Sequence, residues 1–152
     1  MRTSYIPPIR VYSDASQSGI GAHVFADGCT RVVRNFFDLD QKAQSSTWRE
    51  LFAVYFSIIS FKTFLHQKHV LWHTDNYATS LIIKNGSNKP ELQQFSEKIF
   101  NFCKEEYINL KVKWIPRQYI SFADRLSKQP DYDDWETTSS LFDYFSTVNP
   151  SQ

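Results

Sequence analysis

The sequence predicts an α/β fold in which helices flank one five-stranded mixed sheet. Three short strand-like segments, separated by turn signals, occupy the chain before residue 38. Helix-like and strand-like segments then alternate to about residue 115. The length of 152 residues and the 41% hydrophobic content are sufficient for a single packed core. One mixed α/β domain is therefore expected, with its first three strands antiparallel and its last two parallel.

The first three strands are expected at residues 10–13, 20–25 and 30–37. Each is rich in β-branched and aromatic side chains, as half-buried strands are. The pair Asp27-Gly28 between the second and third strands is a strong hairpin signal, because both residues tolerate the positive φ of a tight turn. These segments predict an antiparallel meander.

Beyond residue 38 we expect a polar loop, then helices and two further strands. Ser46 or Thr47 is suited to cap a long helix. Its apolar face contains Leu51, Val54, Tyr55, Ile58, Ile59 and Phe61. The predicted elements are a loop over 38–46, helices over 48–65, 77–84 and 90–106, strands over 70–74 and 110–115, and short helices near 122–124 and 139–145. Trp72 and Trp114 fall inside strands and are expected in the core, and Trp135 is expected to pin the tail to the body.

The order of these elements also predicts how the sheet is connected. A right-handed crossover through the 48–65 helix makes strand 70–74 a parallel neighbour of strand 10–13. Asp14 and Asp75 then each lie just past the end of one of these strands, where open α/β sheets bind ligands. The two aspartates are expected to face each other.

Charge is distributed unevenly along the chain. Residues 1–128 carry 17 basic and 11 acidic side chains, whereas residues 129–152 carry five acids and no Lys or Arg. We therefore divide the chain into a domain over 1–128 and an acidic C-terminal extension over 129–152, with a short helix packed on or near the domain. The basic body suits a polyanionic partner, although such a balance is also common on ordinary surfaces.

The remaining composition limits the class of protein. No apolar run approaches the roughly 20 residues that cross a bilayer, and the N-terminus has no apolar leader, so a soluble intracellular protein without membrane contact is expected. Cys29 and Cys103 have no metal-ligand spacing and are expected to be small buried side chains. The four histidines have no ligand spacing either and are expected outside any site.

Four acids deserve to be considered together: Asp14, Glu50, Asp75 and Asp124. Taken singly, each is readily explained as a turn residue or as an acid in the first turn of a helix. Together they come from four separated elements, all at predicted strand ends or helix starts, with no basic residue expected to be fixed among them. Convergent carboxylates repel each other unless cations neutralise them. The set therefore indicates a metal site.

Five motifs occur in order around these acids. They are Tyr12-Ser13-Asp14-Ala15-Ser16 with Gly19-Ile20-Gly21, then Ser45-Ser46-Thr47-Trp48-Arg49-Glu50-Leu51, His73-Thr74-Asp75-Asn76, Trp114-Ile115-Pro116-Arg117, and Ala123-Asp124-Arg125-Leu126-Ser127. In this set the chain closely resembles the ribonuclease H domain of DIRS-like retroelement polyproteins, the reverse-transcribing elements that carry a tyrosine recombinase. The resemblance covers about residues 10–146, and five motifs in register are far more specific than any one of them.

The resemblance implies a ribonuclease H-like fold and two-metal hydrolysis of phosphodiester bonds. Matched residue by residue, Asp14, Glu50, Asp75 and Asp124 correspond to the family's metal-binding acids. Oxygen ligands without a His or Cys cluster favour two Mg²⁺ ions, with Mn²⁺ as a substitute. The implied partner is an RNA–DNA hybrid or another nucleic acid. The sequence does not identify a protein partner.

Six further residues are candidates for substrate binding. Ser16 and Gly19 are placed to let the first hairpin approach an RNA strand and its 2′-hydroxyls. Arg49, Asn76 and Arg117 are candidates for phosphate contacts. Trp48 has two interpretations that we leave open, stacking on a sugar or base and packing in the core.

The chain departs from the resembled family at one point, and it differs from cellular ribonucleases H at another. Ile120 stands where the family usually has Asn, four residues before the last acid, and cannot orient that loop by hydrogen bonding. Replacing Ile120 by Asn is therefore expected to improve metal binding or cleavage. The flexible catalytic histidine of cellular ribonucleases H has no counterpart here. Pro116-Arg117 occupies that region, as Pro-Arg does in the resembled retroelement branch.

Three functions fit these observations. The leading one is an endonuclease that cuts the RNA strand of RNA–DNA hybrids, because all four acids are present. The second is a catalytically weak or inactive domesticated module that binds nucleic acid or protein. The third is a DNA nuclease or resolvase of the same fold, since metal-dependent hydrolysis does not depend on the sugar. Only substrate contacts distinguish the first from the third.

Overall fold

The computed structural model describes residues 7–26 and 28–120. Its sheet consists of β1 (Ile9–Ala15), β2 (Gly19–Ala26), β3 (Cys29–Phe36), β4 (His69–Thr74) and β5 (Asn109–Trp114). The strand order is β3-β2-β1-β4-β5, with β1–β2 and β2–β3 antiparallel and β1–β4 and β4–β5 parallel. The helices are α1 (Leu39–Lys42), α2 (Ser46–Ser60), α3 (Lys62–Leu65), α4 (Tyr77–Asn85) and α5 (Pro90–Glu106). The predicted ribonuclease H-like mixed sheet is confirmed.

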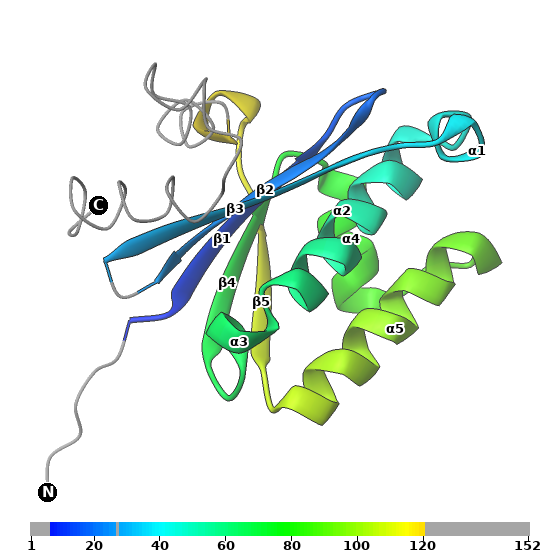
Figure 1. Cartoon of the computed structure of the whole chain (residues 1–152). Coiled ribbons are helices and arrows are strands. Elements are labelled where there is room, and N and C mark those ends of the chain that lie inside the picture. Colours follow the sequence, from blue (N-terminus) through cyan, green and yellow to red (C-terminus); the bar gives the residue numbers. More distant parts are fainter. Residues whose placement is uncertain (1–6, 27, 121–152) are drawn as a thin grey trace, which may run out of the picture.

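Helices α2, α4 and α5 all lie against one face of the sheet (Figure 1). The core fills this interface, where the inward side chains of β1 and β2 meet the apolar face of α2. Val11, Val24 and Leu51 are completely buried there. Trp72 of β4 is also fully buried, and its indole Nε1 donates a hydrogen bond of 2.8 Å to Ser13 Oγ on β1. This bond gives the indole N–H of the largest fully buried side chain a partner and ties β4 to the central strand β1.

The hairpin predicted at Asp27-Gly28 is confirmed by the register of β2 and β3. Ala26 pairs with Cys29, which leaves a two-residue connection, and Gly28 has the positive φ of 74° that such a turn requires.

The first long helix differs from the prediction at both ends. Its N-cap is Ser45, whose side chain accepts a hydrogen bond from the Trp48 N–H, rather than Ser46 or Thr47. Three consecutive residues of capping type stand there, so local preference alone does not choose among them. At its other end the helix stops at Ser60, and α3 follows as a separate short helix. The predicted loop over 38–46 contains α1, which begins with a capping box between Asp38 and Gln41.

Three predicted core side chains lie further out than expected. Trp114 is 46% exposed because it ends β5, the edge strand of the sheet, and its Nε1 donates to the Asp75 carbonyl at 3.1 Å. Ile59 is 41% exposed because it lies beside the buried stripe of α2 rather than within it. Cys29 is only partly buried, whereas Cys103 is buried as expected.

The remaining sequence predictions fall outside the described residues. They are the short helices near 122–124 and 139–145, Asp124, Trp135 and the boundary between 1–128 and 129–152. Within residues 7–26 and 28–120, no helix has both the length and the apolar character needed to span a bilayer.

Candidate active site

Three of the four predicted acids converge at one edge of the sheet. Asp14 is the sixth residue of β1, Asp75 directly follows β4, and these strands are parallel neighbours in which Tyr12 pairs with His73. Glu50 lies in the first half of α2, which packs across β1. One carboxylate oxygen from each of the three lies within 4.8 Å of the others. Asp14 lies inside its strand rather than just past it, because β1 extends to Ala15.

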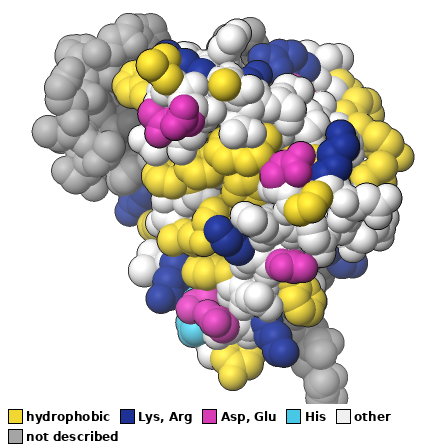
Figure 2. Space-filling view, turned by 90° about the vertical axis from the view of Figure 1, so that its right-hand side faces the viewer, with side chains coloured by type: hydrophobic (Ala, Val, Ile, Leu, Met, Phe, Trp, Pro, Cys, Tyr) yellow, Lys and Arg dark blue, Asp and Glu magenta, His cyan; other side chains and the backbone are white. Residues whose placement is uncertain are grey.

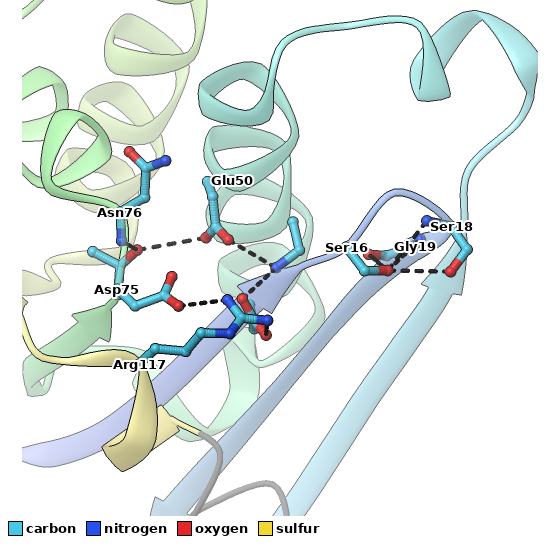
Figure 3. A network of polar contacts seen from close by, with 10 residues as sticks. Ser16, Ser18, Gly19, Glu50, Asp75, Asn76 and Arg117 are labelled. Carbon is cyan, nitrogen blue, oxygen red and sulfur yellow. Dashed lines mark hydrogen bonds and ion pairs between the residues drawn. The ribbon is translucent and has the colours of Figure 1, made fainter.

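Glu50 is held in place by the backbone of β1. Its side chain is buried, and its Oε2 accepts a hydrogen bond of 2.9 Å from the Ala15 N–H (Figure 3). Thr74 Oγ1 donates to Glu50 Oε1 at 3.5 Å. Burial, and next the charge of Asp14, raises the pKa of Glu50 to about 9. In the metal-free protein this carboxyl is therefore protonated at neutral pH.

Asp14 experiences the same electrostatic environment. Burial raises its pKa first, and the neighbouring charge of Asp75 raises it further, while Arg117 opposes both effects. The raised pKa values of Asp14 and Glu50 thus have the same two causes, burial first and the charge of a neighbouring carboxylate second. Such a cluster of carboxylates attracts cations.

A basic side chain is fixed among the acids, contrary to the sequence prediction. Arg117 Nη1 lies 2.8 Å from Asp75 Oδ2, and Arg117 Nη2 lies 3.7 Å from Asp14 Oδ2. These two aspartates raise the pKa of the Arg117 guanidinium. The prediction was wrong because Arg117 lies 42 positions from Asp75, so no local pattern shows that they meet.

Asn76 shapes the loop that carries Asp75. Its Oδ1 accepts the Thr79 N–H at 2.8 Å and so caps α4, and its own N–H donates to Thr74 Oγ1 at 3.1 Å. These bonds fix the backbone on both sides of Asp75. A phosphate contact by the remaining amide group of Asn76 stays a prediction.

Ser16 and Gly19 form the tight connection between β1 and β2. Ser16 Oγ accepts the Ser18 and Gly19 N–H groups at 3.1 and 3.2 Å, and the Ser16 N–H donates to the Gly19 carbonyl at 2.8 Å. A Cβ atom at Gly19 would lie 2.3 Å from the Asn35 carbonyl oxygen, so close packing against β3 alone requires glycine here. The expected RNA contact of this turn remains a prediction beside that structural role.

Trp48 and Arg49, two further candidates for substrate binding, make contacts within the protein. The Trp48 ring stacks on Phe52 at 5.4 Å between centroids and meets Phe95 edge-on at 5.3 Å, which favours packing in the core over base stacking. Arg49 Nη1 donates to the carbonyls of Gln44 and Lys42 at 2.6 and 3.2 Å, which ties the segment between α1 and α2 to the start of α2. A phosphate contact by Arg49 would have to coexist with these bonds.

A cleft of about 570 Å³ adjoins the acids. Asp14, Ser16 and Arg117 line it, together with Arg34 and Phe36, two residues of β3 that sequence reasoning missed. Phe36 is 85% exposed. The sequence signal that could have identified it is an aromatic residue near the end of a predicted strand.

Ile120 also lines this cleft and is only 3% exposed. The side chain that stands where the resembled family usually has Asn is therefore accommodated by burial. We therefore expect Asn at this position to destabilise the protein rather than to improve the site, because its amide group would be buried there.

The helical side of the molecule has no single cluster of charge among the described residues on view (Figure 2). In Figure 2 its acidic and basic side chains are scattered among apolar ones and do not gather into one basic patch. Among the described residues on view, this side lacks the electrostatic pattern that nucleic-acid surfaces usually show.

The fold is similar to the folds of solved ribonuclease H structures. LC11-RNase H1, solved in complex with an RNA/DNA hybrid, superposes with a TM-score of 0.64 and 19% identity, over 82% of this chain and 98% of that one. RNase H1 from the archaeon Halobacterium salinarum gives a TM-score of 0.58 at 10% identity, over 78% and 92% of the two chains. The foamy viral protease-reverse transcriptase in complex with RNA/DNA hybrid gives 0.57 at 12% identity, over 96% of this chain and 21% of that one.

The sequence comparison identifies the family itself. Residues 6–102 match the RNase H-like domain found in reverse transcriptase, and the chain belongs to this family. The matched region contains Asp14, Glu50 and Asp75. No curated protein sequence matches the chain significantly.

Proposed function

We propose that this domain is a metal-dependent endonuclease that cleaves the RNA strand of RNA–DNA hybrids and derives from a DIRS-like retroelement. The observation that carries the proposal is the convergence of Asp14, Glu50 and Asp75 within 4.8 Å in an RNase H-like domain of reverse transcriptase type. The five motifs in register support the DIRS-like origin. The hybrids bound in the LC11 and foamy virus structures support the choice of substrate.

The residues present fit a divalent metal ion. All the donors are carboxylate oxygens, which hard cations such as Mg²⁺ and Mn²⁺ prefer, and burial together with the neighbouring carboxylates raises the pKa values of Asp14 and Glu50. Asp14, Glu50 and Asp75 would hold the ions, with Asp124 as the proposed fourth ligand. Bound there, two Mg²⁺ ions would supply electrophilic stabilisation of the charge that develops on a phosphodiester.

The chain's own groups would orient this centre. The Ala15 N–H and Thr74 hydroxyl fix the Glu50 carboxylate, and the Asn76 cap fixes the loop of Asp75. Ser16, Gly19 and Arg117 border the adjoining cleft, where we propose that the RNA strand and its phosphates bind.

The test is a cleavage assay with end-labelled RNA–DNA hybrid, duplex RNA and duplex DNA in Mg²⁺ or Mn²⁺. We expect cleavage of the RNA strand of the hybrid, with 5′-phosphate and 3′-hydroxyl ends, and none in chelator. Asp14→Asn or Asp75→Asn should lower the rate by several orders of magnitude while hybrid binding survives. Asp40→Asn removes an exposed acid of α1 and is the matched control.

Two outcomes would replace the proposal. Binding of hybrid without metal-dependent cleavage above the Asp75→Asn background would indicate a binding module that has kept the fold. Preferential cleavage of duplex DNA would indicate a DNA nuclease.

A further inference from the structure

The position of Arg117 is defined by the backbone on either side of it. The Ile115 N–H donates to the Thr74 carbonyl at 2.9 Å, which joins the end of β5 to the end of β4. The Tyr119 N–H donates to the Pro116 carbonyl at 3.0 Å, and Ile120 is buried. The Cα of Arg117 is thus held beside the acids, while its side chain is 67% exposed and points toward Asp75 (Figure 3).

We propose that Arg117 is a built-in counter-cation of the acidic cluster, which occupies Asp14 and Asp75 in the metal-free protein and must be displaced when a metal ion binds. This inference rests on the metal site of the proposed function. It adds a regulatory property of that site, because the affinity for metal then depends on the strength of an internal ion pair.

The geometry supports competition rather than cooperation. Arg117 contacts Asp75 Oδ2 and approaches Asp14 Oδ2, and carboxylate oxygens of the same two residues belong to the candidate metal cluster. A divalent cation placed between these oxygens would lie close to the guanidinium, and two like charges at such a distance repel strongly in a partly desolvated place. Metal binding and the Arg117 ion pairs therefore exclude each other.

Displacement of Arg117 is inexpensive because its side chain is already largely in water. A partly exposed ion pair of this kind contributes little, so its loss should change metal affinity only by a small factor. The long stem of Arg117 would let the released guanidinium turn toward the neighbouring cleft, which Arg117 also lines.

The experiment is a calorimetric titration of Mn²⁺ into the whole chain without nucleic acid. Arg117→Gln should bind Mn²⁺ about two- to fivefold more tightly than wild type, the range that a partly exposed ion pair gives. In chelator the same variant should melt at a lower temperature than wild type, because the acids lose their counter-cation. A residue with a purely structural role would not change these two readouts in opposite directions.

Three further variants make the result specific. Lys113→Gln removes one positive charge from β5 without touching the acids, so it should leave Mn²⁺ affinity close to wild type. Arg117→Lys keeps the charge but loses the forked geometry and should fall between wild type and Arg117→Gln. Asp75→Asn should abolish or strongly weaken Mn²⁺ binding. Titrations at pH 7 and 8.5 show whether the order of Mn²⁺ affinities among the variants is the same at both pH values.

The outcomes separate this inference from the proposed function. Equal or weaker Mn²⁺ binding by Arg117→Gln at both pH values, while Asp75→Asn loses binding, overturns the competition and leaves the metal site standing. Mn²⁺ binding that is absent in every variant, or that survives in Asp75→Asn, overturns both. If Arg117→Gln does not fold, Arg117→Lys decides by the same comparison with wild type.

Discussion

Glu50→Gln should change how the stability of the metal-free protein depends on pH. Burial and the charge of Asp14 raise the pKa of Glu50 from an ordinary value of 4.5 to about 9. The folded protein therefore retains a proton that the unfolded chain releases above pH 4.5. This stabilisation is complete below pH 4.5 and is lost as the pH rises through 9.

The size of the effect follows from the single proton involved. One retained proton makes the free energy of unfolding fall by about 1.4 kcal/mol for each pH unit within this window. Gln has no such proton, and its carbonyl can still accept the Ala15 N–H that Glu50 accepts now. Between pH 6 and pH 8, the free energy of unfolding of Glu50→Gln should thus rise by roughly 3 kcal/mol relative to that of wild type.

The assay is urea unfolding in chelator at pH 6, 7, 8 and 9. Glu105→Gln, which alters an exposed acid of α5, is the control and should follow wild type throughout. With saturating Mg²⁺ the wild-type trend should disappear, because metal binding expels the Glu50 proton and becomes up to about tenfold tighter per pH unit, which offsets the loss of about 1.4 kcal/mol per pH unit. A stability difference between Glu50→Gln and wild type that stays constant from pH 6 to pH 8 would refute the reasoning.

Two further substitutions test the packing around the site. Gly19→Ala should cost about 1–3 kcal/mol in urea unfolding, since its Cβ would lie 2.3 Å from the Asn35 carbonyl oxygen, whereas Gly21→Ala should be nearly neutral because its nearest such neighbour is 4.0 Å away. Equal costs for the two glycines would contradict the close approach to β3. Ile120→Asn should lose at least about 2 kcal/mol because Ile120 is 3% exposed, against about 1 kcal/mol for Ile120→Val. A stable Ile120→Asn variant with tighter Mn²⁺ binding would instead restore the expectation drawn from the sequence.

The convergence of Asp14 and Asp75 could be predicted because it follows from connection rules. Two strands of one sheet that are joined by a crossover helix run parallel, and a short right-handed connection makes them neighbours. Residues at the carboxyl ends of such neighbouring strands then meet at one edge of the sheet. The observed parallel pairing of Tyr12 with His73, two residues before Asp14 and Asp75, confirms this prediction. Glu50 follows as well, since the helix of the crossover must pack on the same pair of strands.

Features that depend on one particular tertiary contact could not be predicted. Ser45, Ser46 and Thr47 cap helices almost equally well, so local preference does not choose among them, and the structure has Ser45 as the cap of α2. Trp114 has the composition of a core residue, yet it is exposed because β5 is an edge strand. The sequence shows how apolar a residue is, but it does not show whether its strand lies in the middle or at the edge of the sheet.

The contact of Arg117 with the acids changes how the site as a whole is understood. Three carboxylates within 4.8 Å need positive charge, and the structure shows two sources of it, the proton retained by Glu50 and the guanidinium of Arg117. A divalent ion at this site would replace both, so its binding free energy is reduced by the cost of expelling a proton and of breaking an ion pair. The first cost falls as the pH rises and the second does not, because Arg remains charged. Metal affinity should therefore respond to pH through Glu50 and to substitution through Arg117. Because Arg117 also interacts electrostatically with Glu50, the double variant Glu50→Gln with Arg117→Gln, compared with the two single variants, should measure how strongly the two contributions are coupled.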